Sequence, residues 1–82
     1  MGISNAKRTE IRRFYKTRRV DLDLTQDDVT ERAGLLVGRF WKIENGRSLP
    51  TDGERKAIAR VLKVAASALP GVEHAEPQAV AS

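Results

Sequence analysis

Helix start and stop signals recur at short intervals in the middle of this chain, so its fold must be built from short helices. The segments Thr25–Asp28 and Thr51–Glu54 each place a hydroxyl three residues before an acid. This is the pattern of a capping box, which satisfies free amides in the first turn of a helix. Gly34 and the pair Asn45-Gly46 are typical of helix ends, because glycine adopts the left-handed conformation at little cost. We therefore predict helices that begin or end at these points.

Apolar residues recur at helical spacing between these signals. The spacing predicts helices over about 8–20, 26–33 and 37–44, a fourth that opens at Thr51–Glu54, and a short fifth over 64–69. No segment alternates as a half-buried strand does. The predicted fold class is all-α, a compact bundle of four to five short helices. The expected core residues are Ile11, Phe14, Tyr15, Val20, Leu22, Leu24, Val29, Ala33, Phe40, Ile43, Ala57, Ile58, Val61 and Leu62.

Size and composition limit what the chain can be. Its 82 residues form one domain at most, and the absence of Cys excludes disulfides and thiolate metal sites. No apolar run is long enough to cross a bilayer and the first residues are not a secretory signal, so we expect a cytoplasmic protein. We expect a flexible basic arm over 1–7, a folded domain over 8–70 and a disordered tail over 71–82.

The sequence lacks the patterns that enzymes and cofactor-binding proteins use. Its one His, His74, lies in the expected tail, and there is no metal-ligand spacing or phosphate-binding glycine loop. The acids between 21 and 31 fall in a turn and at a helix start, where they serve capping rather than acid–base chemistry. We expect no enzymatic activity and no cofactor.

The net charge of +4 is unevenly distributed along the chain. Residues 1–19 contain seven basic side chains and one acid, whereas residues 20–36 contain five acids and one Arg. Such polarity indicates either a basic face that meets a polyanion or an ordinary solvated helix surface, and charge alone does not separate the two.

A set of short motifs occurs in a fixed order along the chain: Leu24-Thr25-Gln26, Val29, Ala33-Gly34, Ile43-Glu44-Asn45-Gly46, Pro50, Ile58-Ala59, Leu62, Val64 and Leu69. In this combination the chain resembles the Cro/repressor-type helix-turn-helix family, also called the Xre family, over about residues 11–69. The resemblance implies a lambda-repressor-like helix-turn-helix between Leu24 and Pro50, which places its second helix in the major groove of double-stranded DNA.

The second helix of the helix-turn-helix, which enters the major groove, is the reading helix. The resemblance also implies roles for individual residues outside it. In the family, a Gln at the start of the first helix of the pair contacts the phosphate backbone, which here is Gln26. Groups just after the second helix also meet phosphate, which points to Asn45, Gly46 and Arg47. A structural ion pair joins the first helix of the fold to the end of the reading helix, and the matching residues are Arg19 and Glu44.

By the same resemblance, the positions that read bases are Val37, Gly38, Arg39, Trp41 and Lys42. Val37 offers only a methyl surface for thymine, and Gly38 has no side chain to contact a base edge. Arg39 and Lys42 are long enough to reach guanine edges or phosphates. Leu36 departs from the Ser or Thr cap that the family uses at this position, and Trp41 is unusual on a helix that faces a groove.

Two functional hypotheses follow. The first is a sequence-specific DNA-binding transcription regulator, repressor-like, which binds its operator as a homodimer. The second is a protein-interaction module on the same fold, which docks a partner protein through Leu36, Val37 and Trp41 on an apolar surface of the reading helix. The apolar residues at positions where polar readers are expected are the main support for the second hypothesis.

Overall fold

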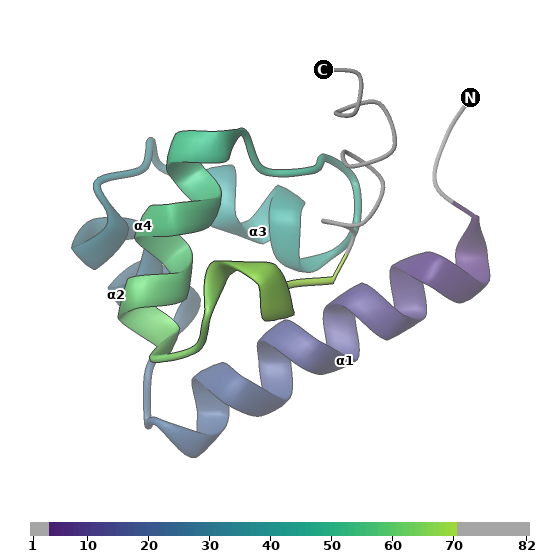
Figure 1. The fold of residues 1–82 in the computed structure, drawn as a ribbon, viewed down its shortest axis with the longest axis horizontal. Helices are drawn as coiled ribbons and strands as arrows, with labels where there is room; N and C mark the ends of the chain where they lie inside the picture. The colour runs from purple at the N-terminus through teal and green to yellow at the C-terminus, as the bar shows by residue number, and fades with distance from the viewer. Residues whose placement is uncertain (1–3, 71–82) are drawn as a thin grey trace.

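The computed structural model describes residues 4–70, which form four α-helices and one 3-10 turn (Figure 1). Figure 1 shows the long first helix along one side, with the other elements gathered across from it. Within residues 4–70 there is no strand, so the predicted all-α class is confirmed. The elements are α1 (Asn5–Asp21), α2 (Gln26–Ala33), α3 (Arg39–Glu44), α4 (Asp52–Leu62) and η1 (Ala66–Ala68).

The core lies where α1 meets the other helices. Tyr15 of α1 packs edge-to-face on Phe40 of α3, with ring centroids 5.6 Å apart, and Phe14 flanks Tyr15 in the same way. Such aromatic pairs add about 1 kcal/mol beyond the area they bury. The buried apolar residues are Ile11, Tyr15, Leu24, Val29, Phe40, Ile43, Ile58, Ala59, Leu62 and Leu69.

The predicted core differs from the observed one at a few positions. Val20 is 53% exposed, so its predicted place in the core is wrong. It follows Ile11 by nine residues, a rotation that brings it to about the opposite face of the helix. Ala59 is buried, whereas the predicted Ala57 is only partly buried. Other expected core residues pack at the edge of the cluster, namely Phe14, Leu22, Ala33 and Val61.

Both predicted capping boxes are confirmed. The Asp28 amide donates to Thr25 Oγ1 at 3.0 Å, and the Thr25 amide donates to Asp28 Oδ2 at 2.9 Å. The hydrogen bond from the Thr25 amide lowers the pKa of Asp28, because it stabilises the carboxylate. The Thr51–Glu54 segment forms the same reciprocal pair at the start of α4. The predicted bounds of α2, 26–33, are those of the structure.

Three predicted boundaries are wrong. The chain is helical from Asn5, because the Ser4 side chain accepts a hydrogen bond from the Lys7 amide and caps α1. The prediction of a flexible arm over 1–7 is therefore wrong for residues 4–7. The reading helix begins at Arg39 rather than residue 37, because Gly38 has a left-handed φ of 83°. The fifth helix is reduced to the 3-10 turn η1. Residues 1–3 and the expected tail over 71–82 lie outside the described residues.

Candidate nucleic-acid interface

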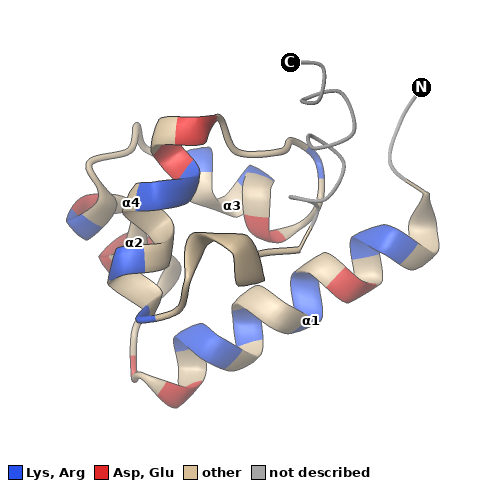
Figure 2. Ribbon diagram, in the orientation of Figure 1, with Lys and Arg blue, Asp and Glu red and all other residues tan. Residues whose placement is uncertain are grey.

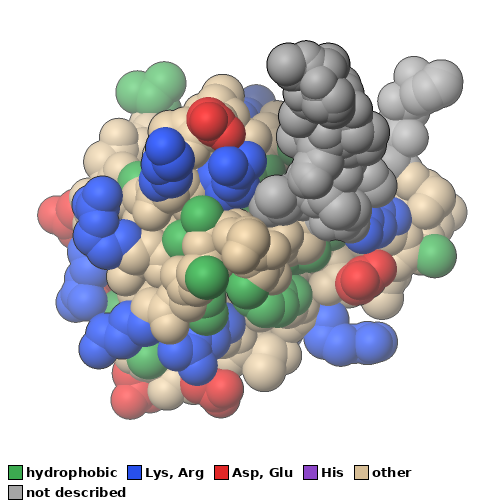
Figure 3. Space-filling model, in the orientation of Figure 1, with side chains coloured by type: hydrophobic (Ala, Val, Ile, Leu, Met, Phe, Trp, Pro, Cys, Tyr) green, Lys and Arg blue, Asp and Glu red, His purple; other side chains and the backbone are tan. Residues whose placement is uncertain are grey.

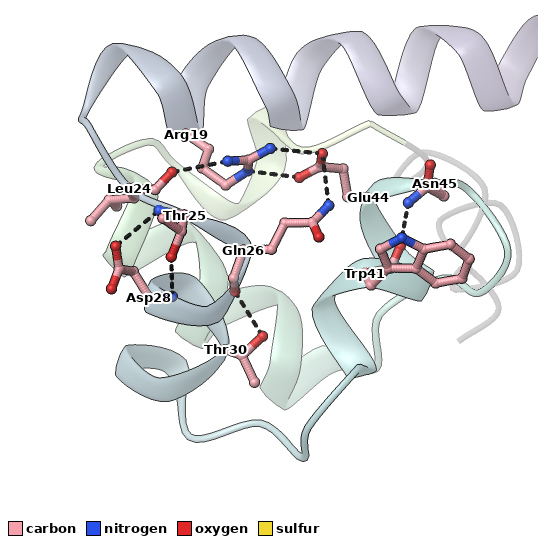
Figure 4. Close-up of polar contacts among 9 residues, drawn as sticks. All are labelled: Arg19, Leu24, Thr25, Gln26, Asp28, Thr30, Trp41, Glu44 and Asn45. Atoms are coloured by element: carbon pink, nitrogen blue, oxygen red, sulfur yellow. Dashed lines mark hydrogen bonds and ion pairs between the residues drawn. The ribbon is translucent and has the colours of Figure 1, made fainter.

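An ion pair between α1 and α3 fixes the C-terminal end of α3 (Figure 4). Arg19 donates from Nε to Glu44 Oε1 at 2.9 Å and from its second terminal nitrogen to Oε2 at 3.1 Å. Its remaining terminal nitrogen donates to the Leu24 carbonyl at 3.0 Å. The Glu44 side chain is only 4% exposed. The contact predicted between Arg19 and Glu44 is therefore confirmed, in the bidentate geometry that makes such pairs strong.

Gln26 joins this pair from the first turn of α2. Its side-chain amide donates to Glu44 Oε2 at 3.2 Å, and Figure 4 shows the side chain reaching toward the carboxylate. The contact gives Gln26 a supporting role that the sequence did not predict. It orients α2 and α3 relative to each other through one buried carboxylate. The phosphate contact implied for Gln26 stays a prediction.

Arg39 lies in a second ion pair, which changes its interpretation. Its Nε donates to Glu54 Oε2 at 2.8 Å and a terminal nitrogen donates to Oε1 at 2.7 Å. Its other contacts are the Ser48 hydroxyl and the Leu49 carbonyl. The hydrogen bonds from Arg39 lower the pKa of Glu54. The guanidinium of Arg39 holds α3 to the following loop and to α4, a role that the sequence did not predict. The base contact implied for Arg39 stays a prediction.

Four predicted site residues come together at the exposed C-terminal half of α3 and just beyond it. Trp41 is 44% exposed, and the Arg47 guanidinium stacks 5.3 Å from the centroid of its ring. The Asn45 side chain donates to the Trp41 carbonyl at 2.9 Å. Lys42 is exposed, and its side chain makes no hydrogen bond or ion pair with residues 4–70. The opposite side of α3 is occupied by buried Phe40, Ile43 and Glu44.

Leu36, Val37 and Gly38 are placed differently from the prediction. They precede α3 instead of lying on it. Of the apolar surface predicted on this helix, Trp41 alone lies on α3, whereas Leu36 and Val37 belong to the turn before it. Leu36 is 82% exposed and Val37 is 98% exposed, and nothing in the described part of the chain packs over them. Leu35 alone of this turn packs against the core.

The structure adds Arg8 and Arg12 of α1 to the residues found at the end of α3. Together with Asn5 and Thr9 they line a cleft of about 270 Å³, whose opposite wall is Asn45 and Arg47. The signal in the sequence was the spacing 5, 8, 9, 12, which puts these side chains on one face of a helix. The predicted helix over 8–20 already held Arg8, Thr9 and Arg12. Sequence reasoning did not join them to Asn45 and Arg47, because that arrangement depends on how α1 packs against the end of α3.

Charge by itself does not locate the interface. Figure 2 shows Lys and Arg positions along α1, on α3 and in the loop that follows α3. On the face seen in Figure 3, cationic side chains are spread over much of the surface, so charge alone singles out no part of it. The end of α3 differs from the rest of the surface because several candidate DNA contacts lie together there. Exposed Trp41, Lys42 and Arg47 are next to the arginines of the cleft.

Other classes of site find no support in the described residues. Residues 4–70 contain no group of His, Asp or Glu placed to hold a metal ion. Among the helices of this part of the chain, none has the length and apolar character needed to cross a membrane. No protein-family model matches the chain, and searches of curated proteins and of solved structures find no match either.

Proposed function

We propose that this chain is a sequence-specific double-stranded DNA-binding transcription regulator of the Cro/repressor type, repressor-like and cytoplasmic, with α3 in the major groove. The observation that carries the proposal is the exposed end of α3, where Trp41 and Lys42 face solvent beside Arg47. A helix held on one side and presenting a cation and an aromatic ring on the other suits groove binding. The order of motifs that resembles the Xre family supports the same function.

The contacts of α3 separate the residues that anchor the helix from those that are free to contact DNA. Arg19 and Arg39 anchor the two ends of the helix through Glu44 and Glu54. Lys42 is the residue left to reach a guanine edge, and Val37 at the preceding turn offers a methyl surface for thymine. A single copy has few such groups and reads few base pairs, so we propose that a homodimer binds a pseudo-palindromic site.

Selection from a pool of random duplexes, carried out with the full chain at two salt concentrations, tests the proposal. A regulator enriches one repeated motif and loses affinity steeply as salt rises. Lys42→Ala should abolish the enrichment, whereas Lys56→Ala, a matched change at an exposed lysine of α4, should leave it intact. If the wild-type chain binds no duplex even at low salt, the proposal is wrong. Sedimentation velocity with the enriched duplex tests the homodimer.

A second candidate function is docking of a partner protein, and one observation favours it. The turn before α3 exposes Leu36 and Val37 almost completely, although apolar side chains of that size gain by burial. The double variant Leu36→Ser/Val37→Ser separates the two functions. Under the DNA proposal it weakens the enriched motif at thymine positions. Under the docking alternative it leaves duplex binding unchanged and abolishes co-purification of a partner.

A further inference from the structure

A polar cleft separates the first turns of α1 from the end of α3. It has a volume of about 270 Å³, and its walls come from two segments that are far apart in the sequence. One wall is a single face of α1, with side chains at helical spacing. The other wall is the chain that leaves α3. The residues that line it are Asn5, Arg8, Thr9, Arg12, Asn45 and Arg47.

Residues 4–70 give this cleft a positive charge and place no acid in its lining. Three of the six lining residues are arginines and none of the six is an acid. The side chains of Arg8 and Arg12 make no hydrogen bond or ion pair with residues 4–70, and among these residues the Arg47 guanidinium has only its stacking contact with the Trp41 ring. Glu10, the acid nearest in sequence, lies within 3.7 Å of Lys7 instead. Three guanidinium groups facing one small space repel each other unless an anion joins them.

The walls of the cleft are held at a fixed separation. Gly46 lies so close to α1 that a Cβ atom at this position would come within 2.8 Å of Arg8 Cγ and 3.0 Å of Arg8 Cα. The Arg47 amide donates to the Lys42 carbonyl at 2.8 Å, and the Gly46 amide donates to the Ile43 carbonyl at 3.1 Å. These two bonds close a Schellman motif that fixes the chain leaving α3. The cleft is thus preformed.

We propose that this cleft binds a backbone phosphate of DNA, bracketed by Arg8, Arg12 and Arg47. The inference rests on the proposed function and deepens it, because it adds α1 to the surface that contacts the duplex. A phosphodiester carries one negative charge and two non-bridging oxygens, to which a planar guanidinium can donate two parallel hydrogen bonds. The two other arginines add electrostatic attraction, and the bound anion reduces the repulsion among the three cations. Arg47 connects the cleft to Trp41 on α3, so the phosphate lies beside the groove that α3 enters.

Salt dependence of duplex binding tests this role. Each phosphate contact contributes about 0.9 to the slope of log affinity against log salt. Arg8→Gln and Arg12→Gln should each flatten the slope, and because both act on one phosphate the double variant should flatten it by no more than about 0.9 in total. The change should be equal on the selected motif and on random duplex, because phosphate contacts carry no sequence information. Arg60→Gln removes the same charge from an exposed site on α4 and should keep the wild-type slope. Equal slopes for all three variants overturn the inference and leave the proposed function standing.

A second arm distinguishes a DNA phosphate from free phosphate. Trp41 is the single tryptophan, and Arg47 stacks on it, so its fluorescence reports on the cleft. The full chain is titrated with inorganic phosphate at constant ionic strength. If no duplex binds but phosphate gives a saturable signal that Arg12→Gln abolishes, the proposed function and the DNA source are both wrong and the cleft takes free phosphate. If neither duplex nor phosphate binds, the cleft is not an anion site.

Discussion

The two turns that flank α3 have the same backbone geometry and opposite surroundings. Gly34 before the helix and Gly46 after it both have a φ of +71°, and both close a Schellman motif. A Cβ atom on Gly34 would meet nothing within 4 Å, whereas one on Gly46 would collide with α1. The leading turn exposes Leu36 and Val37, whereas Gly46 in the trailing turn is buried against Arg8.

This difference indicates that the trailing end of α3 is held more firmly than the leading end. The trailing end is attached to α1 by the close approach at Gly46 and by the ion pair of Glu44 with Arg19. The leading end is attached through Arg39 to Glu54, in a pair with more exposed side chains. We therefore expect substitutions at the trailing end to cost more stability than equivalent ones at the leading end.

Glu44→Ala is the largest expected effect. It leaves the guanidinium of Arg19, which is 13% exposed, without its carboxylate and removes the acceptor of Gln26. Loss of one partner from a buried pair costs about 3–5 kcal/mol, because the remaining charge stays desolvated. Denaturant unfolding followed by circular dichroism measures it. A loss as small as that of Glu31→Ala, at an exposed position on α2, would contradict the buried role.

Gly46→Ala should be the next largest. The left-handed conformation costs a non-glycine residue roughly 1–2 kcal/mol, and the collision with Arg8 adds an overpacking cost, for a total of about 2–4 kcal/mol. Thermal unfolding measures the loss. If Gly46→Ala and Gly34→Ala cost the same, the close approach to α1 contributes nothing and the comparison between the turns fails.

Arg39→Met tests the attachment of the leading end. The change keeps the apolar stem and removes the hydrogen bonds to Glu54, so we expect a loss of about 1–3 kcal/mol. Lys42→Met is the matched control, since Lys42 has no such partner among residues 4–70 and should unfold like the wild type. The reverse ranking in a denaturant titration would contradict the anchoring role of Arg39.

Gly34→Ala isolates the conformational cost at the leading turn. With nothing within 4 Å of the added methyl group, only the left-handed backbone is penalised, at roughly 1–2 kcal/mol. Gly34→Asn provides a control, because Asn tolerates this conformation better than Ala and should recover part of the loss. Equal losses for both variants would point to a steric contact instead of backbone strain.

Acidification should weaken the leading attachment by a fraction of the Arg39→Met effect. The pKa of Glu54 lies below its usual value of 4.5, mainly because Arg39 donates hydrogen bonds to the carboxylate. A lowered pKa means that this stabilisation is present above the unfolded-state pKa and is lost as pH falls through the folded-state value. The stability difference between wild type and Arg39→Met should therefore shrink below about pH 4.5. A constant difference would exclude Glu54 as the partner that matters.

Local signals in the sequence predicted the order of the α-helices and the bounds of α2, because caps and turns involve residues that are close together in the chain. Thr25 and Thr51 cap helices whose acids lie three residues away, and Gly34 closes a turn of its own chain. Helical spacing likewise placed Tyr15, Phe40 and Ile58 in the core. The Arg19–Glu44 contact, which joins residues distant in sequence, was predicted from the family resemblance and not from the residues themselves.

Tertiary structure alone decided which cations are free to bind. Arg39 and Lys42 are both cationic residues of the same short helix, and the sequence predicted the same role for both. In the structure, Arg39 pairs with Glu54 and Lys42 faces solvent. Arg8 and Arg12 share a cleft with Arg47, because Gly46 has no side chain and α1 can therefore pack closely against the chain that leaves α3. Capping and periodicity act within a few residues along the chain. A guanidinium's partner depends on which helices pack together, and this is set by the folded core.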